Sequence, residues 1–186
     1  MTKFILHGGY TSVQNEHNDG FFKEIVRDIS DGGQVLIVYF ARNEDEYEKL
    51  FEQDTQQFEK AANGKKLKLA LADMSSFIDQ VKSSSAIYIR GGETQRLLEA
   101  LRHYPNFASV IRGKTVAGSS AGAYVLATNY DTNSKKENRK GLGILPLNVM
   151  CHFHNNFEAL DELKRRAPEL ETITLKNYEY KVVLNS

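Results

Sequence analysis

The sequence predicts an α/β fold with one doubly wound, mostly parallel sheet and helices on both of its faces. Short apolar runs alternate with longer segments of helical periodicity along the 186 residues, a pattern typical of a parallel sheet covered on both sides. In addition, one apolar run passes through a glycine- and serine-rich turn directly into a helix-forming segment, at 114–128. The length and the average composition predict that residues 1–186 form a single domain.

The strands are predicted from apolar runs bounded by polar or glycine-containing breaks. Five such runs are residues 3–7, 34–40, 67–71, 86–90 and 114–118, and LPLNVMCHF at 145–153 predicts a further strand. The tail ETITLKNYEYKVVL, residues 171–184, predicts a terminal hairpin with its turn near Lys176 and Asn177.

The helices are predicted from apolar side chains at helical spacing. Residues 17–30 place five of them on one stripe, and Gly32 and Gly33 end that segment before the next strand. Residues 43–62 predict a long acidic amphipathic helix, and shorter ones follow at 121–128 and 157–167. The polar run at 130–141 predicts an exposed loop or hairpin beside the candidate site.

The charge balance excludes several classes of partner. Lys plus Arg and Asp plus Glu each number 24, so there is no global field to hold nucleic acid or an anionic membrane.

The apolar run near the N-terminus is too short for a signal sequence or a membrane span. A single cysteine, Cys151, rules out an internal disulfide and suits a reducing compartment. We therefore expect a cytoplasmic protein.

The strongest chemical signal is GSSAG at 118–122, between the strand at 114–118 and the helix that follows. This is G-x-S-x-G in the strand-turn-helix context that presents a nucleophile. Ser120 is the predicted nucleophile, in preference to Ser119 at the variable position. Small neighbours are needed where strand and helix nearly touch, and the Ala121 N–H at the helix start can donate to an oxyanion.

A serine nucleophile needs a base, and the base needs an orienting group. His152, at the end of the strand over 145–153, is the predicted base, with His154 as its rival. The chain order serine, acid, histidine points to Asp131 as the orienting acid. Three other carboxylates stay open as alternatives: Glu137, Glu158 and Asp161. Cys151 is expected to pack in the interior. His152 and His154 lack the third protein ligand that a zinc site takes, so no metal is predicted.

A second glycine-containing turn supplies further backbone hydrogen-bond donors for the substrate carbonyl. Gly91 and Gly92 follow the strand at 86–90 and allow backbone N–H groups to approach a substrate carbonyl. Arg90, just before them, is either a receptor for a substrate carboxylate or an ordinary charge at a strand end. The similar turn at His7-Gly8-Gly9 is interpreted as a pocket wall.

These motifs together resemble peptidase family S51, the dipeptidase E and cyanophycinase group of the class I glutamine amidotransferase-like fold. The matching stretches are GGETQRLL at 91–98, GSSAGA at 118–123, GLGILP at 141–146 and CHF at 151–153. The resemblance implies Ser120 as nucleophile, His152 as base, Gly92 and Ala121 near the oxyanion hole, and no metal or organic cofactor. It also implies a small acidic substrate, since family members act on aspartyl dipeptides or β-aspartyl-arginine units.

One position departs from the family pattern. The usual Gly-Gly-Asn-Thr is Gly-Gly-Glu-Thr here, which places Glu93 near the expected pocket. If Glu93 faces the ligand, its carboxylate repels an aspartyl substrate.

The sequence thus predicts a serine hydrolase of the S51 kind that cleaves a small peptide or amide, with an N-terminal aspartyl dipeptide as the candidate substrate. The alternative is a non-catalytic protein that keeps the fold and binds a small ligand or a partner. No nucleic-acid or membrane partner is expected, and a homodimer is compatible with the apolar tail.

Overall fold

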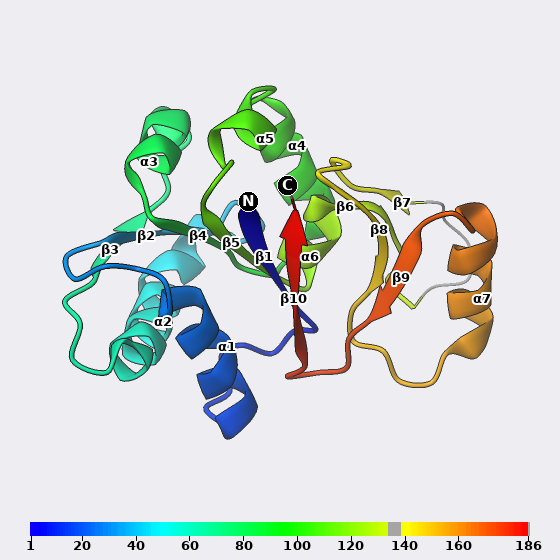
Figure 1. Ribbon diagram of the computed structural model, residues 1–186, viewed down its shortest axis with the longest axis horizontal. Coiled ribbons are helices and arrows are strands. Elements are labelled where there is room, and N and C mark those ends of the chain that lie inside the picture. The colour runs from blue at the N-terminus through cyan, green and yellow to red at the C-terminus, as the bar shows by residue number, and fades with distance from the viewer. Residues whose placement is uncertain (134–138, 186) are drawn as a thin grey trace.

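The computed structural model, which describes residues 1–133 and 139–185, arranges its strands in two sheets (Figure 1). The larger has six strands in the order β10-β1-β5-β4-β2-β3, and the smaller has four in the order β7-β6-β8-β9. The strands of the larger sheet are β1 Thr2–His7, β2 Gln34–Val38, β3 Lys68–Leu71, β4 Ala86–Ile89, β5 Thr115–Ser119 and β10 Tyr180–Asn185. Those of the smaller sheet are β6 Ala127–Tyr130, β7 Arg139–Lys140, β8 Leu145–Met150 and β9 Glu171–Thr174.

The larger sheet is parallel except for its edge strand β10, which pairs antiparallel with β1. Its five parallel strands match the five apolar runs of the sequence to within about two residues at each end. Their carboxyl ends therefore meet at one edge of the sheet, where ligands bind in open α/β proteins.

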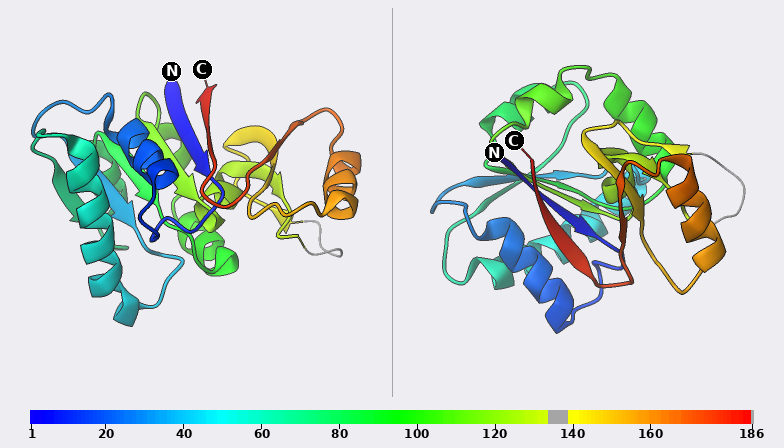
Figure 2. Two further views of the ribbon diagram at one scale, coloured as in Figure 1. Left: turned by 90° about the horizontal axis from the view of Figure 1, so that it is seen from below. Right: turned by 45° about the vertical axis from the view of Figure 1, so that its right-hand side comes forward.

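Helices cover both faces of this sheet, as predicted for a doubly wound fold (Figure 2). On one face, α1 (Glu16–Val26) and α2 (Tyr47–Ala62), the latter preceded by the 3-10 turn η1 (Glu44–Glu46), bury Phe21, Phe22 and Phe58 against alternate strand residues. The other face carries α3 (Phe77–Ser83), α4 (Thr94–Arg102), α5 (Phe107–Val110) and α6 (Ala121–Leu126). Successive side chains of a strand point to opposite faces, so each wholly apolar run supplies both cores.

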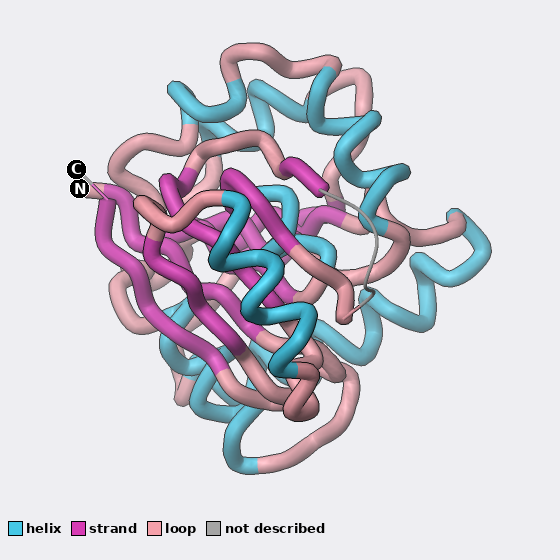
Figure 3. The backbone as a smooth tube through the Cα atoms, turned by 90° about the vertical axis from the view of Figure 1, so that its right-hand side faces the viewer, coloured by secondary structure: helices cyan, strands magenta, loops and turns pink. Residues whose placement is uncertain are grey.

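The second sheet was not predicted, because the sequence indicated one sheet only. It packs into the same core as α3 to α6, through residues such as Leu147, Val149 and Ile173. Helix α7 (Phe157–Arg166) covers its outer face (Figure 3). There Leu160 and Leu163 form a buried hydrophobic cluster with Met150. At the two ends of the polar run, β6 and β7 pair antiparallel, while residues 134–138 of the run lie outside the described residues.

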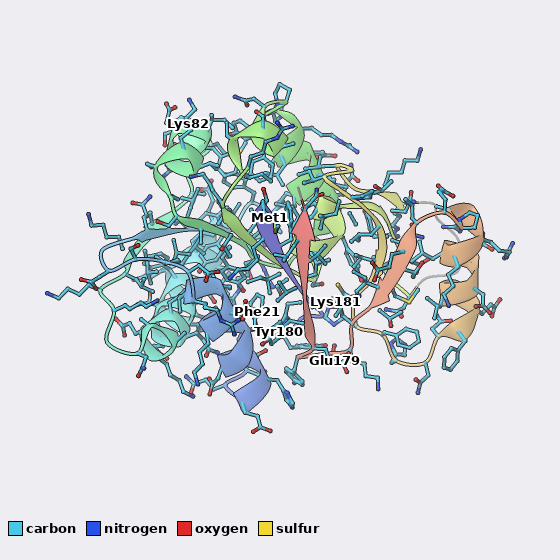
Figure 4. All side chains as sticks on the ribbon, in the orientation of Figure 1. Met1, Phe21, Lys82, Glu179, Tyr180 and Lys181 are labelled. Atoms are coloured by element: carbon cyan, nitrogen blue, oxygen red, sulfur yellow. The ribbon has the colours of Figure 1, made fainter. Side chains whose placement is uncertain are left out.

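The predicted terminal hairpin is wrong. Strands β9 and β10 do not pair with each other: β9 pairs with β8 in the small sheet, and β10 pairs with β1 in the large one. The turn between them, residues 175–179, therefore crosses from one sheet to the other. Tyr180, directly after that turn, lies beside Phe21 of α1 with ring centroids 6.0 Å apart (Figure 4).

Among the described residues, none of the helices is long and apolar enough to cross a membrane.

Candidate active site

Ser120 lies on the tight turn between β5 and α6. Its backbone is left-handed (φ 50°, ψ −107°), a strained conformation for a residue with a side chain. The Ser120 N–H donates to His7 O over 2.9 Å, which ties the turn to β1. A Cβ at Gly118 would come within 2.8 Å of Ala123 N, so only glycine permits this approach of strand and helix. Ser120 is half-buried.

His152 follows β8 and faces Ser120. Its Nε2 lies 2.9 Å from Ser120 Oγ. The residue has a positive φ of 54°. The ring packs edge-on against Tyr10 at 5.3 Å between centroids, and a Cβ at Gly9 would overlap it.

Asn177 completes a hydrogen-bonded chain with these two residues. Its Oδ1 lies 2.7 Å from His152 Nδ1. A carbonyl oxygen only accepts hydrogen bonds, so His152 must carry its proton on Nδ1. The lone pair of Nε2 then points at the Ser120 hydroxyl, which is the tautomer a general base needs.

The expectation that Asp131 orients His152 is corrected by this contact, because Nδ1 has one hydrogen and Asn177 takes it. Asp131 lies at the end of β6, 2% exposed, with its N–H donating to Val149 O over 3.1 Å. Of the three alternatives, Glu158 and Asp161 lie on α7, and Glu137 lies outside the described residues.

The turn that carries Asn177 is held against the turn after β1. Gly8 N–H donates to Glu179 O over 2.8 Å, and Tyr178 N–H donates to Gly9 O over 3.3 Å. His152 N–H also donates to Gly8 O, over 3.2 Å. A side chain on Gly8 would overlap Lys176 O. The two glycines thus let three chain segments meet behind the site.

His7 holds the turn after β1 through hydrogen bonds of its side chain. It is fully buried, accepts a hydrogen bond from Gly9 N–H at Nδ1 over 2.9 Å, and pairs through Nε2 with Asn18 Oδ1, also over 2.9 Å. Asn18 in turn donates to Tyr10 O and Val13 O. Burial lowers the pKa of His7 to about 4, so the ring is neutral at physiological pH.

Ser120 and His152 border a cleft of about 270 Å³. Its remaining walls come from the ends of β1, β2, β4 and β5: Tyr10, Thr11, Ser12, Arg42, Arg90, Gly91, Gly92 and Ser119. Both arginines are cationic, and the lining contains no carboxylate. Each guanidinium pairs with a carboxylate that does not line the cleft: Arg90 with Asp54, and Arg42 with Glu46 over 3.3 Å.

The guanidinium of Arg90 is committed to structural partners. It forms an ion pair with the buried Asp54 of α2, whose other oxygen accepts from Tyr39 Oη over 2.7 Å. Arg90 Nη2 also donates to Ser12 Oγ at the cleft wall. Of the two predicted roles for Arg90, a charge with internal partners fits this geometry better than a carboxylate receptor.

Arg42 is the arginine that sequence reasoning missed. It is half-buried, and its Nε donates to Gly91 O over 2.6 Å. Gly91 packs directly on the nucleophile turn, since a Cβ there would lie 3.1 Å from Ser120 Cβ. Arg42 thus links the ends of β2 and β4 beside Ser120. Its position after the apolar run at 34–40 was the only available signal.

Glu93 does not line the cleft. Its carboxylate caps α4 by accepting from Gln95 N–H over 2.8 Å and from Arg96 N–H. Such a cap stabilises a helix N-terminus by about 1 kcal/mol. The predicted repulsion of an aspartyl substrate by Glu93 therefore has no support in this geometry.

Two other residues lie near the site without facing the cleft. Cys151 is fully buried, and burial raises the pKa of its thiol well above the usual range, so it packs as an apolar side chain, as the sequence predicted. His154 is exposed and bonds through Nδ1 to His152 O over 2.8 Å. No group of three or more potential metal ligands occurs within residues 1–133 and 139–185.

Asn177, the partner of His152 Nδ1 that sequence reasoning missed, carries little sequence signal. It lies 25 residues after His152 in a segment that looks like an ordinary turn, and asparagine is common in turns. Only the crossing of the chain between the two sheets brings it to the site.

The doubly wound sheet, with a histidine-paired serine at the carboxyl ends of its strands, defines an α/β protein of the serine-hydrolase class. The profile of peptidase family S51 matches residues 4–183, and the chain belongs to this family of serine peptidases.

Two solved structures share the fold. A peptidase from an acI-B1 Actinobacterium is 23% identical and superposes with a TM-score of 0.73, over 98% of this chain and 83% of the other. A protein of Listeria monocytogenes EGD-e, described as a candidate peptidase E, is 19% identical with a TM-score of 0.66, over 98% and 97% of the two chains.

Proposed function

We propose that this peptidase hydrolyses short peptides or related amides through an acyl-enzyme on Ser120, with His152 as general base and Asn177 as the residue that orients it. The observation that carries the proposal is the chain of two hydrogen bonds, 2.9 Å from Ser120 Oγ to His152 Nε2 and 2.7 Å from His152 Nδ1 to Asn177 Oδ1. Ser120 and His152 both line a cleft of about 270 Å³.

In the first half of the reaction, Ser120 Oγ attacks the scissile carbonyl carbon while its proton moves to His152 Nε2. The tetrahedral intermediate carries a negative charge on oxygen. The backbone N–H groups of Ala121 and of the Gly91-Gly92 turn are the candidate donors to it. His152 then returns the proton to the leaving amine as the carbon–nitrogen bond breaks.

In the second half, water attacks the ester carbon of the acyl-enzyme. His152 accepts one proton of that water and returns it to Ser120 Oγ as the acid product leaves. Asn177 holds the imidazole ring in the same orientation in both halves. It is neutral, so it stabilises the imidazolium through the dipole of its amide rather than through a full charge.

A peptide with an N-terminal acidic residue is the proposed substrate, and an aspartyl dipeptide is the leading candidate. The support is Arg42 in the cleft wall, since a guanidinium pairs with a carboxylate through hydrogen bonds. Its Nε donates to Gly91 O and its Nη1 pairs with Glu46, so a substrate carboxylate would bind at the same guanidinium as Glu46. The Glu93 carboxylate is engaged in capping α4.

The test is product release from aspartyl, β-aspartyl and neutral dipeptides and aminoacyl amides by the wild-type protein, Ser120→Ala and Ser119→Ala. Ser119 is the matched control, because it is the adjacent residue and loses the same hydroxyl. We expect Ser120→Ala to lose roughly 10⁴-fold or more in kcat/KM, by analogy with other serine hydrolases, and Ser119→Ala to keep most of its activity.

A wild-type rate that survives in Ser120→Ala would refute the nucleophile assignment. Equal rates on aspartyl and neutral substrates would refute the proposed acidic specificity and leave the hydrolytic mechanism standing.

A further inference from the structure

A second cleft lies next to the candidate active site, on the other side of Arg42. Its volume is about 400 Å³, larger than that of the Ser120 cleft. Arg42 lines both clefts, so the two share a wall. Ligand sites usually have volumes of roughly 300–1,000 Å³. The Ser120 cleft is below that range, and the second cleft is within it.

The floor of this second cleft is largely apolar. It is formed by Phe40 at the end of β2, Tyr47 of α2, Ala100 of α4 and Met74 from the loop after β3. Met74 is 44% exposed, so its side chain is accessible to a ligand at the cleft. Methionine adapts its shape to different partners, so this floor suits apolar side chains of varied size.

Arg96 gives the second cleft its charge. Its Nη1 donates to Asn43 Oδ1 over 2.6 Å, which holds the guanidinium at the cleft by a neutral partner. In the described part of the chain, no carboxylate forms an ion pair with the Arg96 guanidinium, whereas Arg42 pairs with Glu46 over 3.3 Å. Glu44 also lines the cleft, and since Glu44 and Arg96 are both exposed, water screens the two charges alike.

We propose that the second cleft is a subsite for the part of a peptide substrate that extends away from the scissile bond. It would take an apolar side chain on its floor and the terminal carboxylate at Arg96. The proposal rests on the function proposed above and adds that the enzyme also takes aspartyl peptides of three or more residues and binds those with an apolar C-terminal residue more tightly than the dipeptide. Two observations point to this occupant. Arg42 lines both clefts, so a peptide bound at Ser120 can continue into the second cleft, and Arg96 supplies a positive charge there.

The test measures binding by Ser120→Ala protein, so that it does not depend on turnover. Calorimetry compares Asp-Ala, Asp-Ala-Leu and Asp-Ala-Leu amide in the Ser120→Ala background, alone and combined with Arg96→Gln. Arg102→Gln is the matched control, because Arg102 is on the same helix and does not line this cleft. Ala100→Phe, which fills the groove, is a second variant.

We expect Asp-Ala-Leu to bind roughly tenfold more tightly than Asp-Ala, which is the fold-change of one well-placed charged hydrogen-bonded pair. Arg96→Gln and amidation of the peptide should each remove most of that gain, while Arg102→Gln should keep it. Ala100→Phe should weaken binding of the tripeptide and leave binding of the dipeptide unchanged.

Two results would refute the proposed subsite. One is equal binding of Asp-Ala and Asp-Ala-Leu, and the other is tighter binding of Asp-Ala-Leu that Arg96→Gln does not reduce. Hydrolysis by the wild-type protein is measured on the same peptides. Absence of hydrolysis together with the expected binding pattern would refute the proposed activity and support the subsite, so the two failures are distinguishable.

Discussion

The residue that changes the chemical interpretation of this site is Asn177. Serine hydrolases of the chymotrypsin type place a carboxylate behind the histidine, whereas here the hydrogen-bonding partner of His152 Nδ1 is a neutral amide. The amide selects the same tautomer as a carboxylate but adds no charge. Asn177 is also exposed, so water competes for its hydrogen bond.

Replacement of Asn177 by Ala should lower kcat by about 10- to 100-fold, which is part of the ~10²–10⁴-fold that general base catalysis contributes. The physical reason is that His152 loses its orienting partner while Ser120 and the cleft stay in place. Steady-state kinetics on the best substrate of the panel measures the effect, with thermal unfolding as the control for folding. A variant with unchanged kcat would show that His152 needs no partner at Nδ1.

Replacement of Asn177 by Asp should move the acidic limb of the kcat/KM–pH profile to higher pH. A carboxylate beside the imidazole stabilises its protonated form. Because the base must be neutral to act, activity is then lost at a higher pH as the solution is acidified. The Asn177→Ala profile is the comparison, since it lacks the new charge. A limb that stays at the wild-type pH in the Asp variant would contradict the assignment of His152 as base.

At the scale of elements, strained turns gather at the carboxyl ends of the strands. Tyr10, Ser120, His152 and Tyr178 all have positive φ values without being glycine. Backbone strain of this kind costs of order 1–3 kcal/mol per residue and occurs chiefly at functional sites. Here the turns after β1, β5, β8 and β9 hold one another by backbone hydrogen bonds.

Gly9→Ala tests this arrangement. Gly9 has a φ of +118°, and an added Cβ would overlap the His152 ring. We expect a loss of activity larger than the loss of stability, because the clash displaces the base. Gly64→Ala is the matched control, since Gly64 also has a positive φ, +92°, but nothing lies within 4 Å of the new Cβ. Similar activities of the two variants, measured on equal amounts of folded protein, would count against a tight fit of His152 on Gly9.

At the scale of the whole molecule, the site depends on a buried polar framework on the α1 and α2 side. His7 and Asn18 hold the turn after β1, and Arg90 and Asp54 connect the end of β4 to α2. A buried ion pair of this kind is costly to break, because the remaining partner keeps an uncompensated charge. The cleft wall therefore keeps its position only while these buried residues stay paired and the fold is intact.

The stability of the protein should fall as the pH is lowered from about 6.5 to about 4. Burial lowers the pKa of His7 from 6.5 in the unfolded chain to about 4 in the fold. In this window the unfolded state binds more protons than the folded state, so acid favours unfolding. At about 1.4 kcal/mol per pKa unit, His7 alone accounts for a loss of up to about 3 kcal/mol.

Urea unfolding at several pH values measures this effect, with His7→Gln as the comparison variant, because glutamine is polar and does not titrate. Carboxylates contribute an acid dependence of their own in both proteins. The slope of unfolding free energy against pH between 4 and 6.5 should be smaller for His7→Gln than for the wild type. Equal slopes would mean that His7 is not held neutral by the fold.

The sequence by itself determined the parallel sheet, the serine turn and the histidine. These follow from local rules: wholly apolar runs specify strands buried on both faces, and G-x-S-x-G between strand and helix specifies the turn at Ser120. His152 was reached in the same way, from its place at the end of an apolar strand. Each of these features is encoded within a short stretch of chain.

The tertiary structure decided the second sheet, the separation of β9 from β10, and the choice of Asn177 over Asp131. Alternating hydrophobicity predicts that a segment is a strand but not which strand it pairs with, because pairing is set by packing between segments far apart in the chain. Strand β10 pairs with β1, at the other end of the sequence, and this pairing carries the turn with Asn177 to His152. Arg42 reaches the site for the same reason, through the side-by-side arrangement of β2 and β4.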